Sequence, residues 1–344
     1  MMKKNSLQQF FSILCAIFCI SVLLSACGGS NGEASSGSGS GDNSGAALDY
    51  PSRTIEFVVP FGAGGSADLF ARSFADLVSR ETGANVNVVN KEGAGGVTGL
   101  TYVSEQDADG YTFCLVTPSM PIAEAKGRFD FSGSFTPIAM MEADVYVVSV
   151  LDSNKNFTDW DGFVSYAKAN PGAVTTGGSS AGGLDEYTAL QFGEAIGAEL
   201  TYVPYDGYGE YKTAFLGGEV DLYIDKLSSF TNMAQYEEII PLLVTSENRV
   251  HSAGLDDTPT STEQGIEFGA SSWRGIVVKN GTPQEIVDYL SSLCERIYES
   301  EDFQTVLKQD NADVVFGYKN ASDFTVHIAS ETERFVDIVA AYGG

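Results

Sequence analysis

Two glycine-rich turns near the start of the chain have the composition of an anion-binding site. Each reads Gly-Ala-Gly-Gly: the first spans Gly62 to Gly65 after the apolar run 55–59, and the second spans Gly93 to Gly96 after the run 86–89. Glycine lets backbone N–H groups approach a ligand closely, and the N-terminus of a following helix favours negative charge. The 31-residue spacing equals about one strand–helix unit, so both turns are predicted at one sheet edge, beside a small anion.

The first turn continues into Ser66-Ala67-Asp68 and fits a loose dinucleotide-binding pattern. That pattern needs an acidic residue at the end of the next strand, where this chain has Asn90, so nucleotide binding is not expected. An anion fits better, with Ser66 and the N–H groups of Gly64 and Gly65 as donors, and with Asp68 shaping the loop. A tight turn without a ligand is the alternative.

A second candidate is the segment Gly178-Ser179-Ser180-Ala181-Gly182, which matches the G-x-S-x-G pattern of a hydrolase nucleophile. A triad also needs an acid and then a histidine further along, and only His251 and His327 follow. The same stretch, up to Gly183, also has the pattern of a hydroxyl- and amide-rich turn that holds an anion. We favour the binding turn, with Ser179, Ser180 and Gly182 as ligand contacts.

Further site residues are expected at two strand ends. Tyrosines cluster in residues 202–208, where they either line a pocket and donate to a carboxylate or pack between domains. We predict that Tyr205, Asp225 and, from the first loop, Phe61 contact the ligand. Two histidines in the chain make a histidine-based metal site unexpected, and no cofactor is predicted.

The N-terminus has the features of a secretory signal. Lys3 and Lys4 precede an apolar stretch over residues 10–24, and Ser25-Ala26-Cys27 follows. This junction resembles a bacterial lipobox, which predicts that residues 1–27 are a signal peptide and that Cys27 carries lipid. A transmembrane anchor is the alternative. Residues 28–49, rich in Gly and Ser, are predicted to be a flexible tether, with an end-to-end distance of roughly 25 Å for 20 residues.

Charge and cysteine content narrow the function classes. The formal charge is −27, and losing Lys3 and Lys4 with the signal takes it to −29. Such a chain is a poor partner for nucleic acid or for polybasic membrane docking, but local backbone dipoles can still hold an anion. Cys114 and Cys294 are predicted to be buried free thiols.

The remaining pattern alternates short apolar runs with amphipathic segments, which predicts an α/β fold. Expected strands are 55–59, 86–89, 111–116, 138–141, 145–150, 174–176, 200–203, 220–224 and 239–245. Expected helices are 68–80, 99–105, 158–170, 185–197, 211–216, a helix starting at 282–285 and 322–341. Thr282, Pro283 and Glu285 have the pattern of a capping box at the start of their helix.

Several short motifs, in order along the chain, carry a family resemblance. They are Tyr50-Pro51, residues 59–68, residues 89–96, Asp109 to Thr112, residues 167–172, Val203-Pro204-Tyr205 with Gly207, residues 217–221, residues 259–265, Trp273-Arg274-Gly275 and Gly281-Thr282-Pro283. With these motifs, residues 50–344 resemble the extracytoplasmic solute-binding proteins of tripartite tricarboxylate transporters, the TctC or Bug family.

The resemblance implies a two-domain, periplasmic-binding-protein-like fold of type II, a Venus flytrap that closes on a carboxylate solute. Domain 1 would use 50–150 and 268–344, and domain 2 would use 151–267. The ligand carboxylate would lie between the loops 61–68 and 178–183. This chain departs from the family at Gly183 and Glu186, where many members have Ser and His, and at Asp206, where many have Lys. Glu186 or Asp206 could accept from an amine or hydroxyl, or be surface charge.

The function expected is therefore that of a lipid-anchored, monomeric solute-binding protein on the extracytoplasmic face of a bacterial membrane. It would pass a di- or tricarboxylate, an amino acid or an aromatic acid to a membrane permease and carry out no chemistry. Two other classes stay open at this point. One is a secreted serine hydrolase that uses Ser180, and the other is a lipid-anchored adhesin or other interaction protein without a small ligand.

Overall fold

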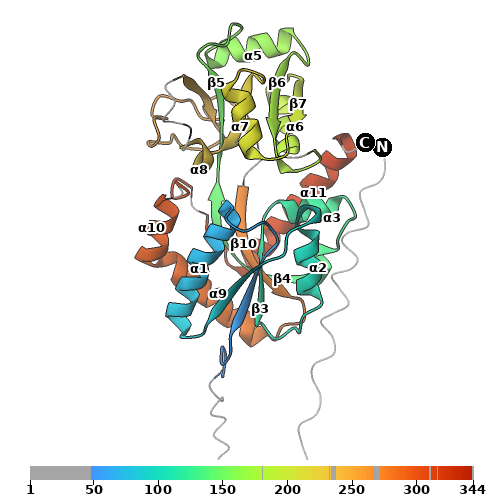
Figure 1. Cartoon of the computed structure of the whole chain (residues 1–344), viewed down its shortest axis with the longest axis vertical. Helices are drawn as coiled ribbons and strands as arrows, with labels where there is room; N and C mark the ends of the chain where they lie inside the picture. The colour runs from blue at the N-terminus through green and yellow to red at the C-terminus, as the bar shows by residue number, and fades with distance from the viewer. Residues whose placement is uncertain are drawn as a thin grey trace, which may run out of the picture. The chain divides into compact units, whose positions relative to one another are not determined.

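The structure of the protein is a computed structural model. It describes residues 48–342 except 180, 232, 234–237, 267, 269–271, 310 and 316 (Figure 1). The signal, the lipid-attachment cysteine and most of the tether predicted above lie outside these residues.

A five-stranded sheet in the order β2-β1-β3-β10-β4 forms the base of a larger lobe. Strand β1 pairs in parallel with β2 and β3, whereas β10 runs antiparallel to β3 and β4. The strands of this lobe are β1 (Ile55–Val59), β2 (Val86–Asn90), β3 (Thr112–Val116), β4 (Phe135–Asp144) and β10 (Ser272–Lys279). Its helices are α1 (Ser66–Thr82), the 3-10 turn η1 (Ala94–Gly96), α2 (Val97–Ser104), α3 (Ser119–Ala125), α4 (Phe131–Ser134), α9 (Gln284–Glu299), α10 (Glu301–Gln309) and α11 (Ala321–Tyr342).

The central strands of the large sheet are buried on both faces, whereas the edge strand β2 is partly exposed. Successive side chains of a strand point to opposite faces. Thus Phe57 of β1 packs against α1, α9 and α10, while its neighbour Val58 packs with residues of α2, α3 and α11. This two-sided burial explains why the central strands β1 and β3 are mostly apolar in sequence.

Two smaller sheets form the second lobe. Strands β8-β5-β9 form an antiparallel sheet, and β6 and β7 form a parallel pair. The strands are β5 (Tyr146–Leu151), β6 (Val174–Gly178), β7 (Leu200–Pro204), β8 (Leu222–Lys226) and β9 (Ile239–Val244), and the helices are α5 (Trp160–Ala169), α6 (Leu184–Ile196), α7 (Tyr208–Leu216) and α8 (Leu227–Phe230). The buried Tyr211 hydroxyl of α7 joins that helix to β8, since it donates to the Leu222 carbonyl at 3.1 Å and accepts the Ile224 N–H at 2.9 Å.

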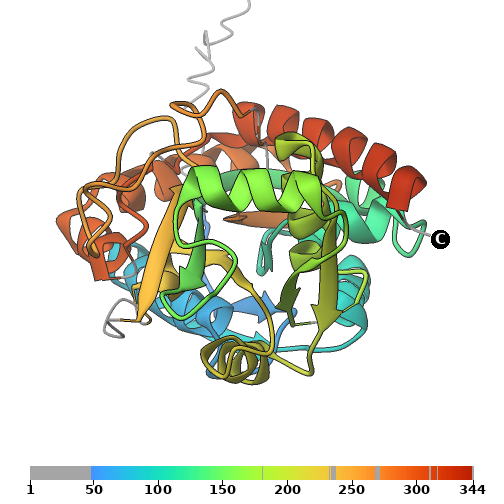
Figure 2. The ribbon, with the colours of Figure 1, turned by 90° about the horizontal axis from the view of Figure 1, so that it is seen from above.

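The chain passes between the lobes at Val145. Strand β4 belongs to the large sheet, and β5, one residue later, belongs to the small antiparallel sheet (Figure 1). Helix α11 makes a further connection. It runs beside α3 (Figure 2), and its Arg334 Nη1 donates to Gln191 Oε1 of α6 at 2.8 Å. The α/β, two-domain prediction is confirmed, whereas the domain boundaries at 150 and 268 stay predictions.

Some elements differ from the sequence prediction. Strand β10 and helices α3, α4, α8 and α10 were not expected. The prediction of a capping box at α9 is also wrong. The helix begins after Pro283 without a side-chain cap. The Thr282 hydroxyl instead donates to the Lys279 carbonyl at 2.8 Å. A hydrogen bond to the preceding turn thus replaces the expected bond to the helix.

The cysteine prediction is confirmed, because Cys114 in β3 and Cys294 in α9 are buried free thiols. Burial raises the pKa of the Cys294 thiol to about 12 and that of Cys114 further still. Among the helices that the structure describes, none combines the length and the apolar character needed to cross a membrane.

Candidate functional site

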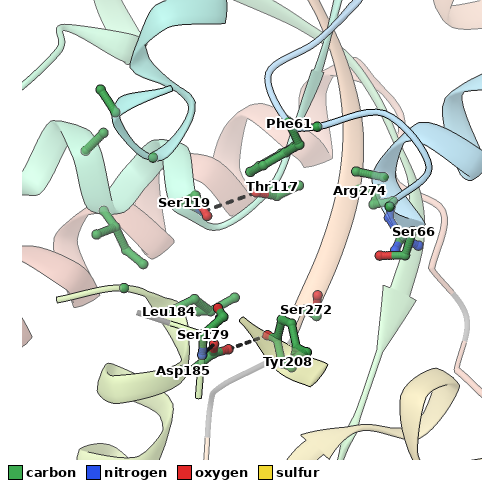
Figure 3. Close-up of a pocket in the computed structure, with 18 of the residues that line it drawn as sticks. Phe61, Ser66, Thr117, Ser119, Ser179, Leu184, Asp185, Tyr208, Ser272 and Arg274 are labelled. Carbon is green, nitrogen blue, oxygen red and sulfur yellow. Dashed lines mark hydrogen bonds between the residues drawn. The ribbon is translucent and has the colours of Figure 1, made fainter. Parts of the chain in front are cut away.

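A cavity of about 580 Å³ lies between the lobes and takes its walls from both (Figure 3). This volume is within the usual range for small-molecule sites. The larger lobe contributes Phe61, Gly62, Ala63, Gly65, Ser66, Ala67, Ala94, Gly95, Thr117, Ser119, Ile122, Ala123, Lys126, Arg128, Ser272, Trp273 and Arg274. The smaller lobe contributes Ser179, Gly182, Gly183, Leu184, Asp185, Tyr208 and Lys226.

The loop between β1 and α1 presents a free helix N-terminus to the cavity. Helix α1 begins after Gly65, and no side chain caps it. The first N–H groups of a helix have no intrahelical acceptor, and the helix dipole concentrates positive potential there. Gly65, Ser66 and Ala67 all line the cavity. This end of the helix can therefore bind a carboxylate through backbone donors.

Asp68 shapes the same loop from behind. Its carboxylate is only 2 % exposed and accepts the Gly64 N–H at 2.8 Å, two bonds from the Arg72 guanidinium at 2.9 and 3.0 Å, and one from the Asn90 amide at 3.0 Å. Gly64 itself has φ = 81°, a conformation that favours glycine. The hydrogen bonds from Arg72 and then from Gly64 lower the pKa of Asp68 to about 2. Asp68 thus remains an anion that fixes the loop rather than a ligand contact.

The second Gly-Ala-Gly-Gly turn has a mixed role. Ala94 and Gly95 line the cavity, whereas the following residues serve packing. A Cβ on Gly99, one turn into the helical region, would come within 2.7 Å of Pro60. The glycines beyond Gly95 therefore allow α2 to lie close to the end of β1.

The Gly/Ser loop supplies the opposite wall. Helix α6 begins after Gly183, again with no side-chain cap. Asp185, in its first turn, accepts the Ser179 N–H at 2.9 Å and the Ser179 hydroxyl at 2.7 Å on one oxygen. Its other oxygen accepts the Tyr208 hydroxyl at 2.6 Å (Figure 3). Three donors thus already satisfy this carboxylate, which orients Ser179 and Tyr208 at the cavity.

Positive side chains dominate the charge of the lining, although the whole chain is strongly acidic. The cations are Lys126, Arg128, Lys226 and Arg274, whereas Asp185 is the single acid among the described lining residues. Arg274 forms an ion pair with the buried Glu142. Lys126 reaches across the cavity, since its Nζ donates to the Gly182 carbonyl of the other lobe. A cluster of this sign in a partly enclosed site attracts a small anion.

The structure brings together half of the predicted ligand contacts. Phe61, Gly65, Ser66, Ser179 and Gly182 line the cavity. Gly64 and Asp68 support the first loop from outside the lining. Ser180 and Cys27 lie outside the described residues.

Two predicted contacts from the smaller lobe lie behind the lining. Tyr205 stacks on Tyr211, with 5.9 Å between the ring centroids. Asp225 is buried and accepts the Tyr223 hydroxyl and the Lys226 N–H, each at 2.8 Å. The two acids left open by the sequence also stay out of the lining, since Glu186 accepts the Gly182 N–H and Asp206 is exposed beside Glu210.

Several lining residues were missed by the sequence analysis. Thr117 and Ser119 follow β3, and Lys226 is the last residue of β8. Ligands of open α/β sheets bind beyond the carboxyl ends of strands. The position of these residues at strand ends could therefore have identified them as lining residues. Trp273 and Arg274 lie on β10, which had no signal of its own, and Lys126 and Arg128 follow the unpredicted helix α3.

The histidines offer no hydrolytic site. His251 pairs with Asp256 on the surface, 3.1 Å between Nδ1 and Oδ1. His327 lies in α11, where its ring packs 5.5 Å from that of Trp273 and burial lowers its pKa. Neither histidine lines the cavity.

Comparison with known proteins agrees with this geometry. Residues 70–343 match the family TctC, the Tripartite tricarboxylate transporter family receptor. The protein BugT of Bordetella pertussis is 28 % identical over 300 residues, which cover 86 % of this chain and 90 % of BugT. A protein of Agrobacterium vitis, from the TAR-I ttuE-ttuC' intergenic region, is 32 % identical over 70 % of each chain.

A solved structure extends the likeness to the fold. The structure of the R. palustris protein Rpa4515 with adipate has a TM-score of 0.71 and 28 % identity, and covers 86 % of this chain and 99 % of that one. The match over most of the chain, the two-lobed fold and the cationic cavity lead to one conclusion: the chain belongs to the tripartite tricarboxylate transporter receptor family, whose members are extracytoplasmic solute-binding proteins and not enzymes.

Proposed function

We propose that this protein captures a small carboxylate solute in the cavity between its lobes and delivers it to a tripartite tricarboxylate-type permease. The observation that carries the proposal is the uncapped N-terminus of α1 at Gly65 and Ser66, which faces the cavity. Carboxylates are favoured there by free N–H donors and by the helix dipole. The adipate held by the related Rpa4515 supports the same ligand chemistry.

Capture would involve closure of the two lobes. In this proposal residues 50–150 and 268–344 form one domain, residues 151–267 form the other, and the protein acts as a monomer. A ligand that touches both lobes binds the closed state more tightly than the open state, and so shifts the population toward closure. The permease would recognise the closed form.

The anchor belongs to the same proposal. Lipid on Cys27 would hold the protein at the extracytoplasmic face of the membrane, and residues 28–49 would let it swivel to the permease. Because one acyl chain anchors weakly, the modification would carry more than one. Mass spectrometry of the membrane fraction tests this directly: lipid on Cys27 is expected, and a Cys27→Ala variant should be released from membranes.

A thermal-shift screen tests solute capture. The panel contains mono-, di- and tricarboxylates, amino acids and aromatic acids at millimolar concentration. A ligand present at 100 times its Kd should stabilise the fold by about 2.7 kcal/mol. If no acid of the panel raises the melting temperature, the proposal is contradicted. Ester hydrolysis by the wild type would instead favour the hydrolase alternative, although neither histidine lines the cavity.

A further inference from the structure

Lys226 is a positive group of the cavity that forms no ion pair with any residue that the structure describes. It is the last residue of β8, and its half-buried side chain lines the cavity from the smaller lobe. Its Nζ lies 5.6 Å from the centre of the Tyr208 ring. Among the described residues, no carboxylate oxygen lies within ion-pair distance of this ammonium group, although the chain has 46 acidic residues.

The other cations of the cavity are engaged or lie in solvent. Arg274 is paired with Glu142 and is 8 % exposed, so its charge is already balanced. Lys126 donates to the Gly182 carbonyl. Arg128 is exposed, where water screens its charge. Lys226 therefore differs from the other three cations of the lining, because it is half-buried and its charge is not balanced by a described acid.

Two buried acids behind Lys226 could have been its partners, but each is satisfied by other donors. Asp144 accepts the Val145 N–H at 2.8 Å and the Ser228 hydroxyl at 2.5 Å. Asp225 accepts hydrogen bonds from the backbone N–H of Lys226 and from the Tyr223 hydroxyl. The lysine charge acts on both through space, since it partly offsets the rise that burial causes in the pKa of each acid. The ammonium hydrogens remain available on the cavity side.

The acid that lines the cavity beside Lys226, Asp185, offers little to a positive group of a ligand. Asp185 already accepts three hydrogen bonds from Ser179 and Tyr208, so it has little acceptor capacity left for a ligand ammonium or hydroxyl. A negative group on the ligand, by contrast, meets an unpaired cation. The chemistry of this wall thus favours an anion over an amine.

We propose that Lys226 binds a second anionic group of the solute and thereby selects dianions over monoanions of equal length. The inference rests on the proposed function, in which the first carboxylate binds at Gly65 and Ser66. These two residues and Lys226 belong to different lobes and line one cavity. A dianion therefore contacts both lobes and stabilises closure, whereas a monoanion lacks the contact with Lys226.

Titration calorimetry of matched acids tests the inference. The probes are succinate, glutarate and adipate, each compared with the monocarboxylate of the same carbon number. Wild type should bind at least one diacid ten times or more tighter than its matched monoacid. Lys226→Met should weaken that diacid roughly 10- to 100-fold, the range of one charge-assisted contact, and leave the monoacid within about twofold. Lys226→Arg should keep the preference for the diacid.

Two controls separate a local effect from charge loss or misfolding. Lys308→Met removes one positive charge from an exposed site on α10 and should leave both affinities unchanged. Thermal melts establish that each variant is folded, and Lys226→Gln replaces the methionine variant if that one unfolds.

The outcomes distinguish this inference from the proposed function. If wild type binds monoacids as tightly as diacids, or if Lys226→Met weakens both equally, the role of Lys226 is overturned while carboxylate capture stands. If Lys226→Met keeps the wild-type preference, the role is overturned as well. If wild type binds no carboxylate of the panel, the proposed function itself fails and takes this inference with it.

Discussion

The Asp68 carboxylate accepts the Gly64 N–H at 2.8 Å, and this bond fixes the loop that leads into α1. Arg72, one turn further along α1, and Asn90, the last residue of β2, hold the carboxylate in place. The loop consequently leaves the N-terminus of α1 uncapped at the cavity. A buried acid thus organises an anion site without touching the anion.

Asp68→Asn should weaken both the fold and carboxylate binding. The amide cannot pair with Arg72 as an anion does, so we expect a loss of about 1–3 kcal/mol in the free energy of unfolding. Affinity for any acid found in the screen should fall about tenfold or more, because the amide has one acceptor oxygen for donors that now share two, and the loop at Gly64 is then held less firmly. Denaturant unfolding and calorimetry measure the two effects.

The acid dependence of stability gives a second readout for Asp68. Its folded pKa of about 2 lies below the ordinary value of 3.8, so its contribution is present above pH 4 and is lost as the pH falls toward 2. Wild type should therefore lose more stability over this range than Asp68→Asn. Asp76→Asn, an exposed site on the same helix, is the control and should behave as wild type. Equal acid dependence in all three proteins would contradict the role of Asp68.

Ser66→Asp should separate binding from stability. A negative side chain in the first turn of a helix stabilises it by about 0.3–1 kcal/mol. The same charge should repel a ligand carboxylate, so affinity should fall at least tenfold while the melting temperature is unchanged or higher. Gln284→Asp makes the matched change at the first residue of α9, outside the cavity lining, and should leave affinity intact. Undiminished binding by Ser66→Asp would count against the site.

Much of the first loop could be predicted from sequence, since the strand 55–59, the glycines and the following helix are local features. Strand β10 could not. Its sequence Ser-Trp-Arg-Gly-Ile-Val-Val-Lys has a charged residue and a glycine at buried positions, and both need distant partners. Arg274 is balanced by Glu142, 132 residues away, and a Cβ on Gly275 would lie 2.2 Å from Phe324 of α11.

The smaller lobe shows the same limit. The Gly/Ser loop was recognised from composition, but the side chains that complete its wall come from α6, α7 and β8. Tyr205 and Tyr208 look alike in sequence, and only the fold sends one to stack on Tyr211 and the other to Asp185. Which residue of a cluster faces a cavity depends on helix phase and strand register, which single-sequence patterns do not give.

The buried acids Asp144 and Asp225 should make stability fall as the pH rises from about 4 to about 7. Burial raises the pKa of Asp144 to about 7 and of Asp225 to about 6. Between the ordinary value near 4 and these values the folded state holds more protons than the unfolded state, so unfolding becomes easier at higher pH. Each group contributes a slope of at most about 1.4 kcal/mol per pH unit.

Isosteric variants test this pH dependence. Asp144→Asn and Asp225→Asn should each flatten the fall in unfolding free energy, measured by denaturant titration at several pH values. Neither substitution alters the charged and polar side chains around these acids, which include Glu142, Arg274, Lys226, Ser228 and Asp185. If both variants keep the wild-type slope, the acids do not titrate as described.

Arg334→Met should loosen the contact of α11 with the smaller lobe. Arg334 donates to Gln191 of α6 and binds Glu331, a carboxylate that is buried and also lies 3.4 Å from the Trp273 indole nitrogen. Loss of the guanidinium leaves Glu331 without its cation, and we expect a cost of about 2 kcal/mol in unfolding free energy.

The partner substitution identifies the source of that cost. Glu331→Gln in the Arg334→Met background should recover part of the loss, because no buried charge is then left unpaired. Arg296→Met, which removes an exposed arginine 3.9 Å from Glu81, should cost less than about 1 kcal/mol. A loss as small in Arg334→Met as in Arg296→Met would show that the α11 contact is dispensable.

The most direct test of the account is a crystal structure of the protein with the tightest acid from the screen. The account predicts one carboxylate group of the ligand within hydrogen-bond distance of the Gly65 and Ser66 backbone N–H groups, inside the cavity between the lobes. A bound acid whose carboxylates all lie away from the N-terminus of α1 would contradict it.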